Sequence, residues 1–481
     1  MPDTIQIDAR TARILPWVVA IAFFMQTLDG TILNTALPGM AASLDAHPLQ
    51  MQGVVIAYML TVALLIPVSG WLADRFGIRQ VFLAAIFVFT LGSLACAASP
   101  TLNLLIVARV LQGIGGAILV PVGRLSILRA YPRDQLVQIL SFITIPGLLG
   151  PLVGPTLGGF LVDYASWHWI FLINLPVGVL GVVCALRYMP NIPRAGALNP
   201  FDKFGFLFFS TFMLTLTIAL EGIGEHSTAY TRLVLLLVTG FVSLAAYCFY
   251  ARRSDNPLFS PDLFRIRNFS VGIAGNLFAR LGTGAMPFLT PLLLQVSLGF
   301  TPLKAGMTMI PMTLGAMIAK SVVTPLVNRL GFRLLLSINT VLLGIMIGGF
   351  SLISKDMPYP VILLIFTVFG MINSMQFSAM NTITLLDLGD EQASSGNSLL
   401  SVIMQLSMSM GVAIAAAILG EFSGIRSSPV TGDLADAFRN TYLCLGFMAT
   451  LSALIFYHVA PSSGKKGTKK NVYQQEKKME H

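Results

Sequence analysis

One carboxylate lies in the middle of the first long apolar stretch of the chain. Residues 23 to 38 read FFMQTLDGTILNTALP, and Asp29 is the only acidic residue inside any of the apolar runs defined below. A charged side chain at the centre of a membrane helix costs roughly 2.5–3.5 kcal/mol on insertion scales, so an intramembrane carboxylate is a candidate functional group. A carboxylate in a medium of low dielectric constant binds a proton more readily, and a nearby arginine opposes this. A site that alternates between these surroundings can load and release a proton.

Arg109 is the arginine that we expect beside Asp29. Asp29 follows Arg13 by 16 residues, which is roughly 24 Å along a helix. Arg109 lies six residues after Asn103 in a run that crosses in the opposite direction, roughly 21 Å above the same face of a 30 Å core. The two charges therefore lie at similar depth. Two plainer interpretations stay open: a static pair that locks two helices, or an Asp29 that sits at the water interface.

Apart from Arg187 and Arg232, which lie one residue from the end of their runs and are counted with the adjoining loops, three more cations fall within apolar runs, namely Arg124, Arg280 and Lys320. Arg280 lies near the midplane in NLFARLGTGAMPFLTP, where glycine and proline favour an interrupted helix that exposes backbone to a cavity. It is a candidate to bind an anionic substrate group or to pair with Asp29, and a packing role is the alternative. We expect the Lys320 side chain to extend to the cytoplasmic face of the membrane and Arg124 to lie at the membrane interface.

The composition places these charges in a membrane protein. Of the 481 residues, 55% are hydrophobic and 11% charged, against about 25% charged in ordinary globular proteins. The net charge of +9 does not indicate nucleic-acid binding, because the basic residues lie mostly in short loops beside apolar runs. The four cysteines lie in apolar segments without a CxxC pair, so neither a disulfide framework nor a zinc site is supported.

The sequence favours a transporter over an enzyme. We find no nucleophile–base motif, no cluster of metal ligands and no phosphate-binding loop. We therefore expect no cofactor, no metal and no ATP site, with a proton gradient as the driving force.

We count fourteen apolar runs long enough to cross the hydrocarbon core. They are residues 14–36, 51–72, 81–98, 103–126, 137–160, 168–188, 204–220, 231–250, 270–294, 306–326, 334–353, 359–383, 398–419 and 440–460. Most lysines and arginines then fall on the side of the two termini, which predicts that both termini are cytoplasmic. The other loops carry only Arg232, Lys304, Lys355, Arg426 and Arg439.

A short repeat divides the runs into two halves. DRFGIR (74–79) follows the second run and NRLGFR (328–333) follows the tenth, 254 residues later. We therefore predict an all-α integral membrane protein of two six-helix halves with an inserted two-helix hairpin. Its parts are an N-terminal tail (1–13), the first half (14–188), the hairpin with its flanking loops (189–269), the second half (270–460) and a basic tail (461–481).

Four motifs resemble those of the fourteen-span drug:proton antiporters of the major facilitator superfamily. They are LDGTILNTALP (28–38), GWLADRFGIR (70–79), RVLQGIGGA (109–117) and GLLGPLVGPTLGG (147–159), and WHWIFLINLPVG (167–178) also fits. The resemblance covers the chain except its lysine-rich tail. It implies the major facilitator fold in a bacterial inner membrane, with small molecules and protons as partners.

The resemblance also implies roles for particular residues. Asp29 and Arg109 are candidates for proton coupling, and Gln26, Asn34, Gln112 and Arg280 for substrate binding or coupling. The cytoplasmic gate would comprise Gly70, Asp74, Arg75, Gly77 and Arg79, with Asn328 in place of the acidic residue in the second half. The antiporter motif would comprise Gly147, Gly150, Pro151, Gly154, Pro155, Gly158 and Gly159, whose glycines let another helix approach closely while the prolines can kink their own helix.

Three functions remain open. The first is proton-coupled export of amphipathic compounds, which is multidrug efflux. The second is export of one specific, anionic metabolite, which the excess of buried cations over Asp29 favours slightly. The third is a sensor or scaffold that does not transport. We expect a monomer that binds no nucleic acid.

The predicted topology can be tested by cysteine accessibility. Lys304→Cys and Lys465→Cys, each in a background without the native cysteines, should react with a membrane-impermeant thiol reagent from opposite faces of the membrane. Labelling of both positions from the same side would contradict the fourteen-span arrangement.

Overall fold

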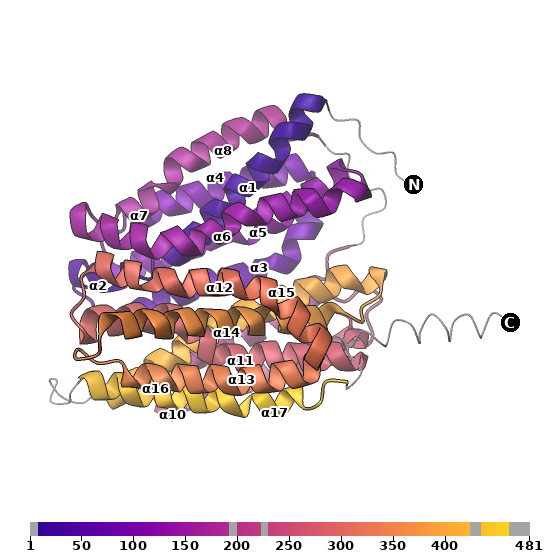
Figure 1. Cartoon of the computed structure of the whole chain (residues 1–481). Helices are drawn as coiled ribbons and strands as arrows, with labels where there is room; N and C mark the ends of the chain where they lie inside the picture. The colour runs from indigo at the N-terminus through magenta and orange to yellow at the C-terminus, as the bar shows by residue number, and fades with distance from the viewer. Residues whose placement is uncertain (1–7, 192–199, 223–228, 424–433, 461–481) are drawn as a thin grey trace. The chain divides into compact units, whose positions relative to one another are not determined.

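The computed structural model describes residues 8–191, 200–222, 229–423 and 434–460, and within these ranges the chain forms helices and no strand (Figure 1). The predicted basic tail (461–481) lies outside the described residues. The described chain forms two compact units, Met1–Leu258 with Met286–Ile310 and Phe259–Ala285 with Pro311–His481.

Most helices of the first unit come from its first segment, which ends at Leu258. They are α1 (Ala9–Ile32), α2 (Leu37–Ser43), η1 (Pro48–Met51), α3 (Gln52–Phe76), α4 (Ile78–Ala97), α5 (Leu102–Ala130), α6 (Arg133–Tyr164), α7 (Trp169–Leu172), α8 (Asn174–Tyr188), α9 (Lys203–Gly222) and α10 (Ala229–Ala251).

The later helices complete both units. They are η2 (Pro261–Arg265), α11 (Arg267–Leu292), the π-helical η3 (Leu293–Ser297), α12 (Pro302–Leu330), α13 (Phe332–Gly349), η4 (Phe350–Leu352), α14 (Tyr359–Leu385), α15 (Asp390–Phe422), α16 (Leu434–Leu451) and α17 (Ala453–Phe456).

Thirteen helical segments of the described residues are long and apolar enough to cross a membrane. They correspond to the first thirteen predicted runs. The fourteenth run, 440–460, is divided between α16 and α17, and the first two turns of α16 carry Asp436 and Arg439. The first run ends earlier than predicted, because α1 stops at Ile32 and a turn leads into the short α2.

The expected interruption near Arg280 is wrong. Helix α11 runs without a break through Gly282, Gly284 and two prolines, and the irregular segment is the π turn that begins at Leu293. The glycines serve close packing instead, because a Cβ at Gly284 would lie 2.8 Å from the Cα of Met408.

The repeated loop motif has the same backbone in both places. Gly77 is the single residue between α3 and α4, and Gly331 is the single residue between α12 and α13. Their φ angles are 93° and 77°, a region that residues with a side chain rarely adopt. The motif therefore needs glycine at this position, and the structure confirms that the two loops are equivalent.

Helices α1 and α6 pack closely along the glycines of the antiporter motif. A Cβ added at Gly150, Gly154 or Gly158 would lie 2.4, 2.3 and 2.2 Å from an oxygen of α1 or of the turn after it. The Thr31 hydroxyl donates to the Gly150 carbonyl (3.1 Å). The predicted glycine stripe therefore exists, and it brings α1 to α6 by backbone contact.

Gly159 has a different partner from the rest of the motif. A Cβ there would lie 2.2 Å from the carbonyl oxygen of Pro302, at the start of α12 in the same unit. Helix α6 remains helical through Pro146, Pro151 and Pro155.

Gly158→Ala should lower the thermal stability of the protein. The new methyl group meets the backbone carbonyl of Ile32, which cannot move without separating α1 from α6, and such overpacking typically costs about 1–3 kcal/mol. Gly30→Ala is the matched control, because a Cβ at Gly30 meets nothing within 4 Å. The melting temperatures of both variants in detergent test this expectation, and equal values would contradict the packing argument.

Candidate functional site

Asp29 and Arg109 form a buried ion pair inside the first unit. The Arg109 Nη1 donates to Asp29 Oδ2 at 2.8 Å, and each residue is 1% exposed. Asp29 lies near the end of α1 and Arg109 in the second turn of α5. The equal depth predicted from the sequence is therefore realised as direct contact, and the interface position considered for Asp29 is wrong.

The second oxygen of the carboxylate accepts two amide hydrogen bonds. Gln112 Nε2 donates to Asp29 Oδ1 at 2.8 Å, and Asn174 Nδ2, at the start of α8, donates to the same oxygen at 3.1 Å. The Ser93 hydroxyl oxygen accepts from both amides, at 3.2 and 2.9 Å, and its proton goes to the Phe171 carbonyl. We call Asp29, Ser93, Arg109, Gln112 and Asn174 the Asp29 cluster.

The guanidinium of Arg109 is enclosed by polar and aromatic groups. Its Nη1 also donates to Gln112 Oε1 (2.6 Å), and its Nε donates to the Val54 carbonyl (3.4 Å). The ring of Tyr58 lies 4.2 Å from the guanidinium carbon and that of Phe171 lies 5.8 Å away. Hydrogen bonds and cation–π contacts thus replace the lost water around the cation.

Glycines allow the helices to meet around this cluster. A Cβ at Gly92 would lie 2.5 Å from the Cα of Gln112, and one at Gly115 would lie 2.4 Å from the Phe89 nitrogen. The backbones of α4 and α5 are therefore close enough for short side chains to reach Asp29.

The sequence anticipated only part of the cluster. Gln26 and Asn34 were candidates, but Gln26 Nε2 donates to the Gly116 carbonyl (3.0 Å) and Asn34 lies in the turn after α1 without a hydrogen bond from its side chain to Asp29. Ser93 and Asn174 were missed. Asn174 stands in the WHWIFLINLPVG segment, where an amide in an apolar run could have signalled it.

The predicted gate residues share one end of α3 and α4. Asp74 accepts a hydrogen bond from Arg129 Nη2 at 2.5 Å, and the Arg79 guanidinium donates to the Leu186 carbonyl in the last turn of α8. The arginine beside a helix end is favoured by the carbonyls there. Asp74 therefore joins α3 to α5, while Arg75 is exposed and Gly70 has open space around it.

Tyr131 lies at the same end, just after α5. Its hydroxyl donates to the Ala12 carbonyl of α1. Burial raises the pKa of the Tyr131 phenol to about 12, so the hydroxyl keeps the proton that makes this bond.

Arg280 belongs to the second unit and has a different environment from Arg109. It is 6% exposed, its Nε donates to Asn276 Oδ1 (2.9 Å) and its Nη2 donates to Asn381 Oδ1 (3.4 Å). The ring of Phe377 lies 4.3 Å from the guanidinium carbon. Among the described residues no carboxylate pairs with it. Arg124 and Lys320 are exposed, as the sequence led us to expect.

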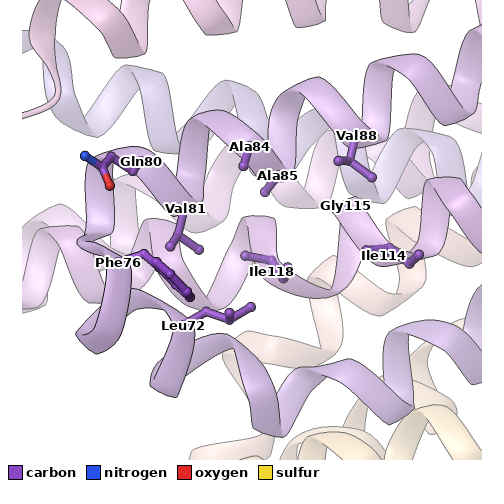
Figure 2. Close-up of a pocket in the computed structure, with 10 residues that line it drawn as sticks. All are labelled: Leu72, Phe76, Gln80, Val81, Ala84, Ala85, Val88, Ile114, Gly115 and Ile118. Carbon is purple, nitrogen blue, oxygen red and sulfur yellow. The ribbon is translucent and has the colours of Figure 1, made fainter. Parts of the chain in front are cut away.

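An apolar groove of about 310 Å³ lies on the first unit, between α3, α4 and α5 (Figure 2). Gln80 stands at one end, and the other lining residues are apolar, among them Phe76, Val88 and Ile114. None of them belongs to the Asp29 cluster, so the groove and the ion pair are separate features.

The Asp29 cluster and both copies of the repeated loop lie within the part of the chain that matches a family model. The model of the Major Facilitator Superfamily covers residues 19–412. The chain belongs to the Major Facilitator Superfamily. It is therefore a multi-pass membrane transporter, as the motifs led us to expect.

Relatives in this superfamily cover almost the whole chain. It is 49% identical over 452 residues to "Putative multidrug resistance protein MdtD" of Pectobacterium carotovorum subsp. carotovorum (strain PC1), with 94% of this chain and 97% of that protein covered. The protein of the same name from Cronobacter sakazakii (strain ATCC BAA-894) is 50% identical over 443 residues, with 92% and 94% covered. These bacterial relatives support an inner-membrane location.

Solved structures of the superfamily share the fold at low identity. The crystal structure of the D-xylose-proton symporter matches with a TM-score of 0.67 at 14% identity, covering 94% of this chain and 99% of that one. A bacterial homologue of the human lysosomal transporter Spinster matches with a TM-score of 0.65 at 13% identity, covering 94% and 97%. At these identities the likeness concerns the fold alone.

Proposed function

We propose that this transporter exports amphipathic small molecules in exchange for protons, with Asp29 and Arg109 as the coupling pair. The observation that carries the proposal is the contact between Asp29 Oδ2 and Arg109 Nη1 at 2.8 Å, away from solvent. Burial of ionisable side chains inside a membrane helix bundle costs free energy, so such a pair is a candidate for a functional role. The relatives named multidrug resistance protein support the substrate class.

The geometry indicates how a proton would act. Addition of a proton to Asp29 removes the negative charge that compensates Arg109, so the pair changes from neutral to a net positive charge. A buried, uncompensated cation is unfavourable, and relaxation requires water, a substrate group or a new helix arrangement around Arg109. Protonation and rearrangement are thereby coupled. In the proposed cycle, proton entry and substrate export alternate at this pair, with both termini in the cytoplasm.

Asp29→Asn should abolish export driven by a pH gradient. Asparagine keeps the size of the side chain and can hydrogen-bond, but it cannot bind and release a proton. Purified protein in sealed liposomes with an internal pH-sensitive dye measures proton movement when lipophilic cations or organic anions are added. Asp356→Asn, at an exposed loop position, is the matched control. Proton movement that persists in Asp29→Asn would remove Asp29 from the mechanism.

Export of one specific, anionic metabolite is the second candidate, and Arg280 favours it. The buried guanidinium of Arg280 is held by two asparagine oxygens and has no carboxylate counter-charge among the described residues, so an anionic group could pair with it. Such a group would offset the cost of burying Arg280 without a counter-charge.

Arg280→Ala should reduce transport of organic anions far more than transport of lipophilic cations in the same liposome assay. An effect on the order of tenfold or more corresponds to the loss of one charge-assisted hydrogen bond. Arg280→Lys is the matched variant, since it keeps the charge and should retain part of the anion transport. Equal loss for anions and cations would indicate a structural role for Arg280.

A further inference from the structure

Every described residue that hydrogen-bonds to Asp29 is a donor. Oδ2 accepts from Arg109, while Oδ1 accepts from Gln112 Nε2 and Asn174 Nδ2. An ionised carboxylate accepts hydrogen bonds only, so this arrangement suits the charged form. A protonated carboxyl group has one O–H to donate, and as arranged the cluster offers it no acceptor.

Arginine cannot become that acceptor, because a guanidinium has donors only. Gln112 has a carbonyl oxygen, but Arg109 Nη1 already donates to it at 2.6 Å. Turning the Gln112 amide would place its nitrogen against the guanidinium and break that bond. Among the described residues, the charged and titratable groups that face Asp29 from the other helices are Arg109, Tyr58 and Cys96, and none of them hydrogen-bonds to its Oδ1.

Asn174 differs from Gln112 in one respect. Its Nδ2 contacts Asp29 Oδ1 and Ser93 Oγ, but its own Oδ1 accepts no hydrogen bond from a described residue. The two ends of an asparagine amide have nearly the same shape, so a half-turn about the last side-chain bond exchanges nitrogen and oxygen without a change of volume. The turned Oδ1 would lie about where Nδ2 lies now, 3.1 Å from Asp29 Oδ1.

We propose that Asn174 is a positioning residue whose amide orientation changes with the protonation state of Asp29. This proposal rests on the proposed function. With the carboxylate ionised, Asn174 donates through Nδ2. When a proton from water adds to Asp29 Oδ1, that hydrogen bond breaks, the amide turns, and the new O–H donates to Asn174 Oδ1. The same turn breaks the bond from Asn174 Nδ2 to Ser93 Oγ, and the Ser93 hydroxyl then donates to Asn174 Oδ1 instead of to the Phe171 carbonyl.

This role gives α8 a part in coupling that the ion pair alone does not give it. Asn174 is the first residue of α8, directly after the short α7, and it is 1% exposed. A change of its hydrogen bonds therefore acts at the junction of two helices. Protonation of Asp29 on α1 thus changes the hydrogen bonds of α8 through the side-chain amide of Asn174.

Infrared difference spectroscopy of the full-length protein between high and low pH tests the proposal. The carboxylic-acid C=O band that appears at low pH should vanish in Asp29→Asn, which assigns it to Asp29. In Asn174→Leu, of similar size but without an acceptor, the acid loses its hydrogen bond and the band should move to higher wavenumber. Asn34→Leu, the same substitution at a buried asparagine whose side chain has no hydrogen bond to Asp29, should leave the band near its wild-type position.

Asn174→Ala replaces the leucine variant if that one does not fold. A measurement on the wild-type protein needs no substitution: with ¹³C-labelled asparagine, a side-chain amide band should change together with the Asp29 band, and this change should be lost in Asp29→Asn. The role of Asn174 alone would be overturned if the Asp29 band keeps its wavenumber in Asn174→Leu and Asn174→Ala. It would also be overturned if the labelled asparagine bands do not change during the pH titration. An acid band that survives Asp29→Asn would instead remove Asp29, and the proposed function with it.

Discussion

A carboxylate that is shielded from water must be surrounded by donors, and this requirement organises the first unit. Asp29 receives hydrogen bonds from α5 and α8, and Ser93 of α4 holds the amides that supply two of them. Removal of one member of a buried pair leaves an uncompensated charge, which in soluble proteins costs about 3–5 kcal/mol. The Asp29 cluster therefore ties four helices together at one point. Helices α1, α4, α5 and α8 each contribute a side chain to this cluster.

The contact between α1 and α6 is of a different kind, and it permits movement. The Thr31 hydroxyl lies 2.9 Å from the Thr27 carbonyl of its own helix and 3.1 Å from the Gly150 carbonyl of α6. Thr35 is placed in the same way between Ile32 and Pro155. If α6 shifts, each hydroxyl keeps an acceptor on its own side, so no buried donor is orphaned. A smooth glycine surface with such replaceable bonds suits a transporter whose helices must slide.

Thirteen of the fourteen apolar runs, the two glycine loops and the pairing of Asp29 with Arg109 could be predicted, because each follows from a local pattern or from counting residues along a helix. Asn174 and Ser93 could not, since their importance depends on which faces of α4 and α8 turn toward α1. The prolines and glycines near Arg280 led to the wrong prediction of an interrupted helix for a related reason. Glycine signals close approach as well as interruption, and only the neighbouring Met408 shows which applies at Gly284. Sequence patterns thus predict the helices and the depth of a residue in the membrane. Which face of a helix turns toward its neighbours is known only from the packed structure.

The two buried arginines impose different conditions on a transport cycle. Arg109 is neutralised by Asp29, so its surroundings are balanced until a proton arrives and leaves a net positive charge. Arg280 has amides and the ring of Phe377 but no carboxylate among the described residues, so its surroundings carry that charge from the start. A proton therefore changes the electrostatic balance at Arg109 alone, whereas a negatively charged substrate group would change it at Arg280. Coupling and substrate selection can then reside on separate residues, which lets the substrate vary while the proton chemistry at Asp29 stays the same.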